Sequence, residues 1–361
     1  MTNNNNILFS KALNLLKLLI AIPSFSRQEH ETASLLVQFL NENGVDAQQL
    51  GNNVYAFNKY FQPGKPTLLL NSHHDTVKPD KAYTLDPFKA IEEDGKLFGL
   101  GSNDAGGSLV ALIATFLNFY EFQDLGYNII FVASAEEEIS GSGGIEAVLP
   151  VLPPIDFAIV GEPTLMQMAV AEKGLMVLDC TSSGITGHAA RNEGENALYK
   201  AMADINWINS YKFEKVSPFL GPVKTTVTVI ETDNKAHNVV PAICKFVVDV
   251  RVNELYTFEE IITIIQQHFQ STIQPRSFRL KSSSIDENHP LVMAGKSLGK
   301  TIYGSPTTSD KALMPFPALK MGPGNSARSH TANEFIYVNE INEAIEDYIK
   351  IINQLVYNTK S

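Results

Sequence analysis

Histidine and carboxylate side chains follow several apolar runs of this chain, at the point where each run ends. The run LLLNSHHDT places His73 and Asp75 two residues apart. The runs LFGLGSND, NIIFVASAEEE, FAIVGEPT and ALKMGPGNSARSH deliver Asp104, the glutamates 136–138, Glu162 and His330. Because ligands of an open α/β sheet bind beyond the carboxyl ends of its strands, we expect these side chains to share one site. Two histidines with several carboxylates suit Zn²⁺, and a spare carboxylate can act as a general base.

Each motif also has an ordinary structural explanation when it is taken alone. Asp75 can orient a metal-bound His73, or the two can form a simple loop pair. Asp104 can bridge two cations, or it can cap the helix expected after it. The triplet 136–138 can bind metal and supply a base, or it can be a solvated acidic turn. His74 is expected to point away from the others and to be structural.

Glu162 and His330 have the same two interpretations. Alone, Glu162 would be a turn residue before a proline, and His330 would be a surface histidine. The joint occurrence of all these motifs at strand ends favours the functional interpretation. The sequence therefore predicts a metal-dependent hydrolase with one or two metals.

The elements that would position these residues alternate between helix and strand. Residues 7–20 and 28–44 have helical spacing, with Ser26 as a candidate helix cap. Runs at 66–71 and 128–135 are typical of buried strands, and 106–122 is typical of a long apolar helix. Alternating elements of this kind predict an α/β fold with a mostly parallel sheet.

The pattern changes between about residues 175 and 288. Short strands surround two helix candidates at 196–210 and 257–270, in the order β-α-β-β-α-β, which fits a small ferredoxin-like α+β domain. The predicted organisation is therefore a catalytic domain at 1–174 and 289–361 that is interrupted by this inserted domain at 175–288.

Bulk properties exclude several classes of partner. The 361 residues carry a formal net charge of −11, which argues against nucleic acid and anionic membranes. Only two cysteines, Cys180 and Cys244, are present, so a reducing cytoplasm is expected. The segment MTNNNNILFSKALNLLKLLIAI has no basic start and is interrupted by polar residues, which favours an amphipathic helix over a signal peptide or anchor.

The set HxD, GxGSxD, EEE, GEPT and GPG…H resembles a known family over nearly the whole chain. This is the acetylornithine deacetylase, succinyl-diaminopimelate desuccinylase and carboxypeptidase family of co-catalytic zinc hydrolases. The resemblance implies two Zn²⁺ ions, with Co²⁺ or Mn²⁺ as possible replacements. It implies that His73 and Glu162 bind the first metal, with Asp75 behind His73. Glu138 and His330 would bind the second metal, and Asp104 would bridge the two.

The resemblance also assigns the remaining catalytic roles. Glu137 would be the general base and later the acid. Segment GITGHAARNEGENA would carry a histidine, His188, that stabilises the oxyanion in the partner subunit of a homodimer. Segment HNVVPAICKFVVDVR would contact substrate through Asn238 and Arg251, with Arg251 on a carboxylate. The alternative interpretations are that His188 is a surface histidine, Asn238 a turn residue and Arg251 a salt-bridged strand residue.

Two positions depart from the family pattern: the change at Glu136 is mild, and the change at Leu100 bears on substrate choice rather than on chemistry. Glu136 stands where the family often has Asp, and Leu100 stands where much of it has Arg. Arg328 is a candidate to supply that missing charge.

The branch that the chain resembles most acts on acetylornithine and related N-acyl amino acids, in arginine or lysine biosynthesis. Succinyl-diaminopimelate and then di- or tripeptides are the alternative substrates. A binding protein that lost catalysis is the non-enzyme alternative, against which the complete set of ligands and Glu137 argues.

Overall fold

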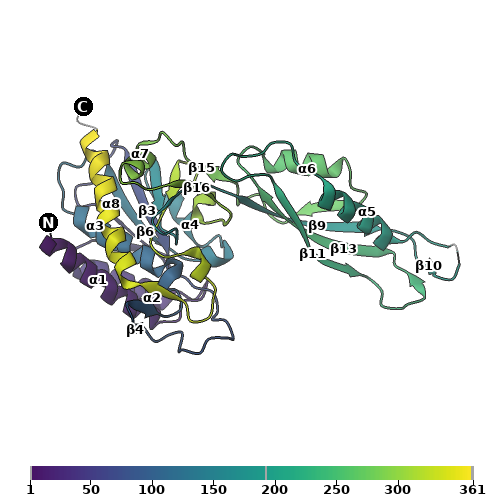
Figure 1. The fold of residues 1–361 in the computed structure, drawn as a ribbon, viewed down its shortest axis with the longest axis horizontal. Coiled ribbons are helices and arrows are strands. Elements are labelled where there is room, and N and C mark those ends of the chain that lie inside the picture. The colour runs from purple at the N-terminus through teal and green to yellow at the C-terminus, as the bar shows by residue number, and fades with distance from the viewer. Residues whose placement is uncertain (1, 192, 359–361) are drawn as a thin grey trace. The chain divides into compact units, whose positions relative to one another are not determined.

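The computed structural model of the chain describes residues 2–191 and 193–358. It divides into two compact units (Figure 1). Met1–Val170, Ser284–Tyr303 and Ser309–Ser361 form the first, called the sheet unit here; Ala171–Ser283 and Gly304–Thr308 form the second, called the inserted unit. Residues 304–308, which the sequence boundaries gave to the catalytic domain, group with the inserted unit.

A mixed sheet with a parallel centre organises the sheet unit, as the sequence predicted. Its strands are β1 (Ala47–Leu50), β2 (Asn53–Phe57), β3 (Thr67–His73), β6 (Asn128–Ser134), β7 (Phe157–Val160), β8 (Met168–Glu172) and β17 (Ala318–Lys320). They lie in the order β1-β2-β6-β3-β7-β17-β8, and the pairs β6–β3, β3–β7 and β7–β17 are parallel. Every residue of β3, β6 and β7 is buried, which explains their uninterrupted apolar runs.

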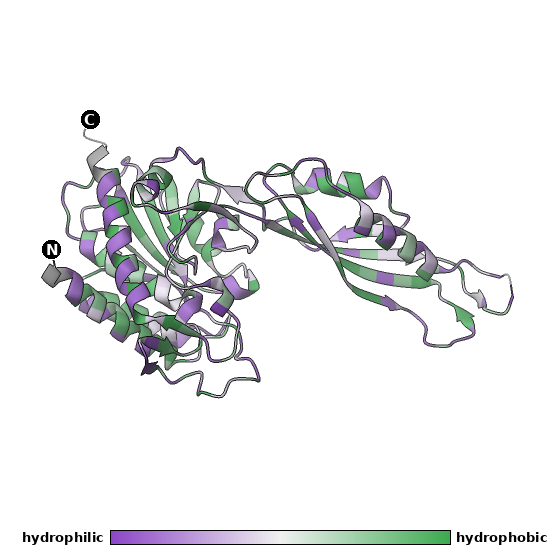
Figure 2. Ribbon diagram, in the orientation of Figure 1, coloured by the Kyte–Doolittle hydropathy of each residue, from purple (hydrophilic) through white to green (hydrophobic). Residues whose placement is uncertain are grey.

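Helices α1 (Thr2–Ile20), α3 (Gly107–Phe119) and α8 (Val338–Asn358) form one layer against this sheet. Helix α3 packs on α1, α8, β3 and β6, so nearly all of its surface is buried and its sequence is apolar all round. Helix α8 faces solvent on one side, and Figure 2 shows the resulting alternation of polar and apolar residues along it.

The opposite face of the sheet packs on shorter elements. Leu69 of β3 and Ile130 of β6 join a buried cluster with Ile145 and Val148 of α4 (Ile145–Val148).

The other elements of the sheet unit are peripheral. Helix α2 (His30–Glu42) packs beside β1 and β2, and α7 (Pro290–Ser297) packs on α8. The short strands β15 (Ser283–Ser284) and β16 (Ile302–Ser305) belong to the central sheet, where each pairs with β8. A separate small sheet contains β4 (Ile91–Glu93), β5 (Lys96–Phe98) and β18 (Phe335–Tyr337). Short helical turns are η1 (Ser102–Gly106), η2 (Glu137–Ile139), η3 (Leu149–Val151), η4 (Asp310–Leu313) and η5 (Ser326–Arg328).

The inserted unit is a four-stranded antiparallel sheet with two helices. Its elements follow in the order β9 (Gly174–Ser183), α5 (Ala197–Ser210), β11 (Lys224–Thr232), β13 (Ile243–Val252), α6 (Phe258–Gln266) and β14 (Thr272–Pro275). The strand order β11-β13-β9-β14 is that of a ferredoxin-like fold. A two-stranded hairpin, β10 (Gly187–His188) with β12 (Val239–Val240), extends from this sheet.

Alternating burial along β9 and β13 builds the core of the inserted unit. Met176, Leu178, Phe246 and Val248 point to one face, where they pack with residues of α5 and α6. Side chains of the opposite face are more exposed. One apolar face per strand is the pattern of an antiparallel sheet that is covered on one side only.

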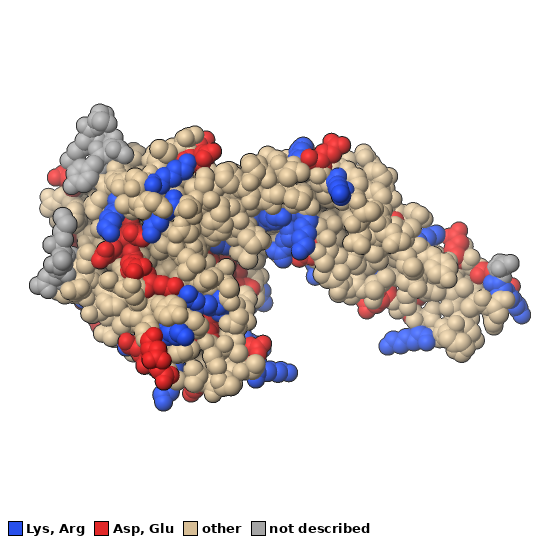
Figure 3. All heavy atoms as spheres, viewed as in Figure 1, with Lys and Arg blue, Asp and Glu red and all other residues tan. Residues whose placement is uncertain are grey.

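No helix of the described residues has an apolar stretch long enough to cross a bilayer. Acidic and basic side chains are interspersed over the face of the sheet unit drawn in Figure 3.

Candidate active site

His73 is the last residue of β3 and is 1% exposed. Its Nδ1 lies 3.0 Å from the backbone carbonyl oxygen of Asp75 and 3.4 Å from the Asp75 carboxylate. These two acceptors fix the ring orientation and leave Nε2 pointing into the cluster. Nε2 faces the carboxylates of Asp104 at 3.4 Å and of Glu137 and Glu162 at 3.9 Å each. The imidazole is thus oriented as a metal ligand would be.

Asp104 lies in the turn that joins β5 to α3. One carboxylate oxygen is 3.4 Å from His73 Nε2 and the other is 3.6 Å from His330 Nε2. Gly101 in this turn has a φ of +74°, and a Cβ there would lie 2.6 Å from the Thr76 side chain. A glycine is therefore required for the turn that brings Asp104 between the two imidazoles.

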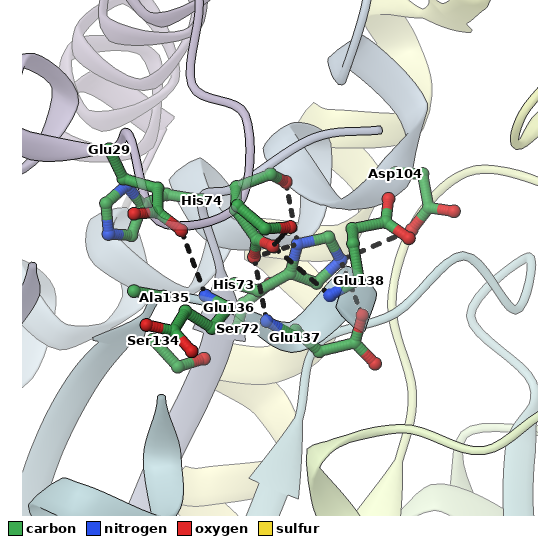
Figure 4. Close-up of polar contacts among 12 residues, drawn as sticks. Glu29, Ser72, His73, His74, Asp104, Ser134, Ala135, Glu136, Glu137 and Glu138 are labelled. Atoms are coloured by element: carbon green, nitrogen blue, oxygen red, sulfur yellow. Dashed lines mark hydrogen bonds and ion pairs between the residues drawn. The ribbon is translucent and has the colours of Figure 1, made fainter. Parts of the chain in front are cut away.

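The acidic triplet after β6 separates into two kinds of residue. Glu138 accepts a hydrogen bond from His330 Nε2 at 2.9 Å, and the Glu137 carboxylate faces His73. Glu136 has a φ of +54° and its carboxylate turns toward Gly143 instead, whose N–H it accepts at 3.4 Å. Two of the three glutamates therefore point into the cluster (Figure 4).

The cluster gathers six side chains that the sequence analysis singled out. Glu162, 7% exposed, follows β7, and His330 follows β17 in a loop where its side chain is 55% exposed. Two subsets have ligand atoms that all lie within 4.8 Å of one another: His73, Asp104 and Glu138; and His73, Glu137 and Glu162. Imidazole nitrogens and carboxylate oxygens at these spacings are a donor set for Zn²⁺ or similar ions.

Burial and mutual repulsion shift the titration of this cluster. Burial raises the pKa of Glu137 well above its usual value, and the nearby Glu162 adds to the shift. Burial, with Asp104 and Asp310 nearby, raises the pKa of Glu162 to about 8. The hydrogen bond to Glu138 raises the pKa of His330 to about 9. Carboxylates held together out of water in this way favour protons or cations among them.

Two buried carboxylates behind the cluster were missed by the sequence analysis. Glu334, 2% exposed, accepts the backbone N–H of Gly101, Asn103 and Asp104 at 3.0, 2.8 and 2.9 Å. It therefore holds the turn that presents Asp104. Its only sequence signal is its position four residues after His330.

Asp310 is the other missed carboxylate. It is 4% exposed and accepts the hydroxyl of Ser134, the last residue of β6, at 2.5 Å. Burial raises the pKa of Asp310 to about 6. Nothing in the segment SDKALM distinguishes this residue from a surface aspartate.

Three secondary expectations can be compared with the structure. His74 is structural, as predicted: its ring nitrogens lie 2.9 Å from Thr32 Oγ1 and 2.9 Å from the Asn52 carbonyl. The prediction of Ser26 as a helix cap was wrong, because α2 begins after Glu29 and the Ser26 hydroxyl donates to Asp75 at 2.7 Å.

Arg328 does not supply the charge that Leu100 lacks. Its guanidinium donates to both carboxylate oxygens of Glu340, at 2.7 and 3.1 Å, and lies over the rings of Phe335 and Tyr337. Because these contacts within the chain occupy the guanidinium, Arg328 has a structural role.

The three predicted functional residues of the inserted unit lie at two separate places. His188 and Asn238 come together, because β10 pairs with β12 and the Asn238 carbonyl accepts the N–H of Ala189 at 2.9 Å. Arg251 lies near the other end of β13, where it forms two hydrogen bonds with Asp249 at 2.8 and 3.1 Å. The structure therefore groups His188 with Asn238 but does not bring Arg251 to them.

A protein-family model described as Peptidase family M20/M25/M40 matches residues 69–354, which include every residue of the cluster. The chain belongs to this M20 peptidase family. It is therefore a hydrolase, and the family resemblance noted in its sequence is confirmed.

Two relatives of this M20 hydrolase are named for the cleavage of N-acyl amino acids. Succinyl-diaminopimelate desuccinylase of Wolbachia pipientis subsp. Culex pipiens (strain wPip) is 25% identical over 378 residues, which cover 96% of this chain and 94% of that protein. Acetylornithine deacetylase of Proteus mirabilis (strain HI4320) is 28% identical over 387 residues, which cover 98% of each chain.

Solved structures of two bacterial peptidases share the fold. Aminopeptidase PepT of Bacillus cereus ATCC 10987 superposes with a TM-score of 0.79 at 17% identity, over 96% of this chain and 98% of that one. YxeP of Bacillus subtilis, described as a dinuclear metal-binding peptidase of the M20 family, superposes with a TM-score of 0.73 at 16% identity, over 98% and 99%. The mixed α/β architecture with its parallel centre is thus the family fold.

Proposed function

We propose that this M20 hydrolase is a two-metal amidohydrolase that removes an N-acyl group from the α-amino nitrogen of an amino acid. The observation that carries the proposal is the convergence of two imidazoles and four carboxylates in one cluster: His73, His330, Asp104, Glu137, Glu138 and Glu162. The description of YxeP as dinuclear supports two metals.

The residues present fit two divalent cations. His73 and Glu162 would hold one ion, and Glu138 and His330 the other. Asp104 would bridge them, since its two carboxylate oxygens lie 3.4 Å from His73 and 3.6 Å from His330. We favour Zn²⁺, with Co²⁺ and Mn²⁺ as alternatives, because the donors are a mixture of nitrogen and oxygen. When bound, the cations would polarise the scissile carbonyl and lower the pKa of water.

Glu137 would transfer the proton. Its carboxylate lies in the cluster but is not needed as a ligand in this arrangement, so an oxygen is free to accept a proton from the attacking water. Burial, which raises the pKa of Glu137, then suits the same group to give that proton to the leaving amine nitrogen.

The inserted unit would complete the site from a second copy of the chain. The β10–β12 hairpin, which carries His188, extends from the end of the inserted sheet where Ile243 of β13 pairs with Ser183. Arg251 pairs with Leu175, about eight residues further along β13. That spacing corresponds to roughly 25 Å of strand. A homodimer would let Arg251 bind a substrate carboxylate in its own site while His188 and Asn238 reach the site of the partner.

The names of the relatives support a proposal for the substrate class. We propose an acetyl or succinyl group on ornithine, citrulline, lysine or diaminopimelate, which would place the enzyme in arginine or lysine biosynthesis. Small peptides are the next candidates. A cytoplasmic location is consistent with Cys180 and Cys244, which are buried and form no disulfide.

The test is the release of free amine from a panel of N-acyl amino acids. Metal-stripped protein would be reloaded with Zn²⁺ or Co²⁺ and assayed with the acetyl and succinyl derivatives of the four amino acids. We expect metal-dependent turnover of at least one derivative and none by Glu137→Ala with its metal content intact. No turnover of any derivative by fully loaded protein would contradict the proposal and direct the search to unblocked peptides.

A further inference from the structure

A pocket of about 240 Å³ in the sheet unit shares a wall with the proposed metal site. His330 lines this pocket and also bonds to Glu138 in the cluster. Leu100, 5% exposed, forms an apolar part of the wall, and Lys78 and Tyr83 supply polar atoms. A substrate whose amide lies at the cluster would therefore extend one of its ends past His330 into this space.

Two hydrogen-bond donors of the pocket have no acceptor among the described residues. Lys78 is exposed and forms no hydrogen bond or ion pair there. The Tyr83 oxygen accepts the backbone N–H of Glu334 at 3.3 Å, but its own hydroxyl hydrogen has no acceptor among these residues. An ammonium and a phenol hydroxyl that line one pocket are suited to a carboxylate.

The acidic residue of this pocket does not neutralise Lys78. Asp80 accepts the backbone N–H of Ala82 at 2.7 Å and forms no ion pair with Lys78. The carboxylates of the neighbouring cluster would repel an anionic end of a substrate. A cation at the pocket is therefore needed where such an end is bound.

We propose that Lys78, assisted by Tyr83, binds a substrate carboxylate in this pocket and so selects acidic substrates. The inference rests on the proposed N-acyl amino acid hydrolysis and specifies its substrate class. The carboxylate has two possible sources: the far end of a dicarboxylic acyl group such as succinyl, or the α-carboxylate of the amino acid. Because His330 is assigned to the metal and Leu100 is apolar, Lys78 is the cation that this pocket offers to a carboxylate.

Direct binding to an inactive, metal-loaded protein tests this assignment. In a Glu137→Gln background, the Kd of N2-succinylornithine, N2-acetylornithine and N2-acetylornithine α-carboxamide would be measured by calorimetry, with and without Lys78→Met. If Lys78 binds the acyl carboxylate, Lys78→Met should weaken the binding of the succinyl compound alone, by about tenfold to a hundredfold, the range for a hydrogen bond to a charged group. If Lys78 binds the α-carboxylate, the variant should weaken the binding of N2-succinylornithine and N2-acetylornithine but not that of the carboxamide.

Control variants separate this effect from general electrostatics. Lys81→Met removes the same charge three residues away and outside the pocket, and should leave every Kd within about twofold, as expected for a surface change. Lys78→Arg should restore most of the lost affinity, and Tyr83→Phe should cause a smaller loss with the same substrate preference. Equal effects of Lys78→Met on all three compounds, or no effect, would overturn the inference.

The outcome is distinguishable from failure of the proposed function. If the wild-type protein hydrolyses these compounds but Lys78→Met leaves their Kd values unchanged, only the inference about Lys78 is contradicted. Lys78-dependent binding without any hydrolysis by the wild-type protein contradicts the proposed chemistry alone.

Discussion

The carboxylate of Asp75 accepts the backbone N–H of Glu137 at 3.0 Å. It also accepts the N–H of Glu138 at 3.2 Å and the hydroxyl of Ser26 at 2.7 Å. The backbone carbonyl of the same residue lies 3.0 Å from His73 Nδ1. Asp75 therefore fixes the end of β3 to the acidic turn that follows β6, and so sets the position of the proposed base relative to the first imidazole.

Replacing Asp75 should misplace both of these groups. We expect Asp75→Ala to reduce metal affinity or kcat/KM by about 10- to 100-fold, as is typical for the outer partners of metal ligands. Steady-state kinetics and metal content per chain would measure this loss. Ser26→Ala removes only one bond to the same carboxylate and should have a much smaller effect, while wild-type kinetics and metal content in Asp75→Ala would contradict the role.

Glu334 should matter for stability as well as for metal binding. Glu334→Ala leaves three buried N–H groups of the turn at 101–104 without their acceptor. We expect a loss of about 3 kcal/mol in the free energy of unfolding of the metal-free protein, because buried donors are costly to leave unpaired. Urea denaturation would measure it, with the exposed Glu287→Ala as a control that should change stability little. An unchanged unfolding midpoint would show that water replaces the carboxylate.

Part of the candidate site was predictable from the sequence. His73, Glu138 and Glu162 were predictable because they lie at or just beyond the ends of the parallel strands β3, β6 and β7, and such ends meet at one edge of a sheet. Asp104 also follows an apolar run, but that run ends in β5 of the small antiparallel sheet, so the geometry of the parallel sheet does not explain its position. The ferredoxin-like order of the inserted unit was equally readable from alternating strands and two amphipathic helices.

Glu334 and Asp310 were not predictable, because their partners are remote in sequence and carry no periodic signal. Glu334 bonds to backbone N–H groups about 230 positions away, which any residue type could supply. The prediction that Arg328 supplies a cation to the site was wrong for a similar reason. Its partner Glu340 lies in the first turn of α8, outside the loop that contains Arg328 and His330.

The cross-subunit role of His188 can be tested by mixing two inactive variants. A dimer of one Glu137→Gln chain and one His188→Ala chain would contain one site with both groups intact. Random pairing of equal amounts should therefore restore about one quarter of wild-type activity, since half of the dimers are mixed and each has one competent site. His188→Ala alone should lower kcat more than it raises KM, because an oxyanion donor acts in the transition state.

The measurement for this prediction is amine release after the two variants are unfolded together and refolded. Each variant refolded alone is the control and should keep only its own low activity, well below that of the mixture. If the mixture gains nothing although mixed dimers form, His188 serves its own chain or does not act on the reaction.

Metal binding should release protons and become tighter as the pH rises through neutrality. Burial and the neighbouring Asp104 raise the pKa of Glu162 to about 8, and the bond to Glu138 raises that of His330 to about 9. Both groups therefore hold protons at pH 7 in the metal-free protein, and a cation must displace them to use the same atoms. Zn²⁺ affinity should rise from pH 6 to pH 8 and level off above the pKa of each group.

Calorimetric titration with Zn²⁺ in buffers of different ionisation enthalpy would count the released protons. Burial opposes protonation of His73, but Glu137, Asp104 and Asp75 outweigh it and raise the pKa of His73 well above its usual value. We therefore expect at least two released protons per chain at pH 7 when both ions bind. Glu162→Gln, which carries no titratable proton, should release about one fewer and should weaken one of the two sites. An affinity that is constant between pH 6 and pH 8 would mean that Glu162 and His330 are not the displaced groups, and the ligand assignment at both sites would then have to change.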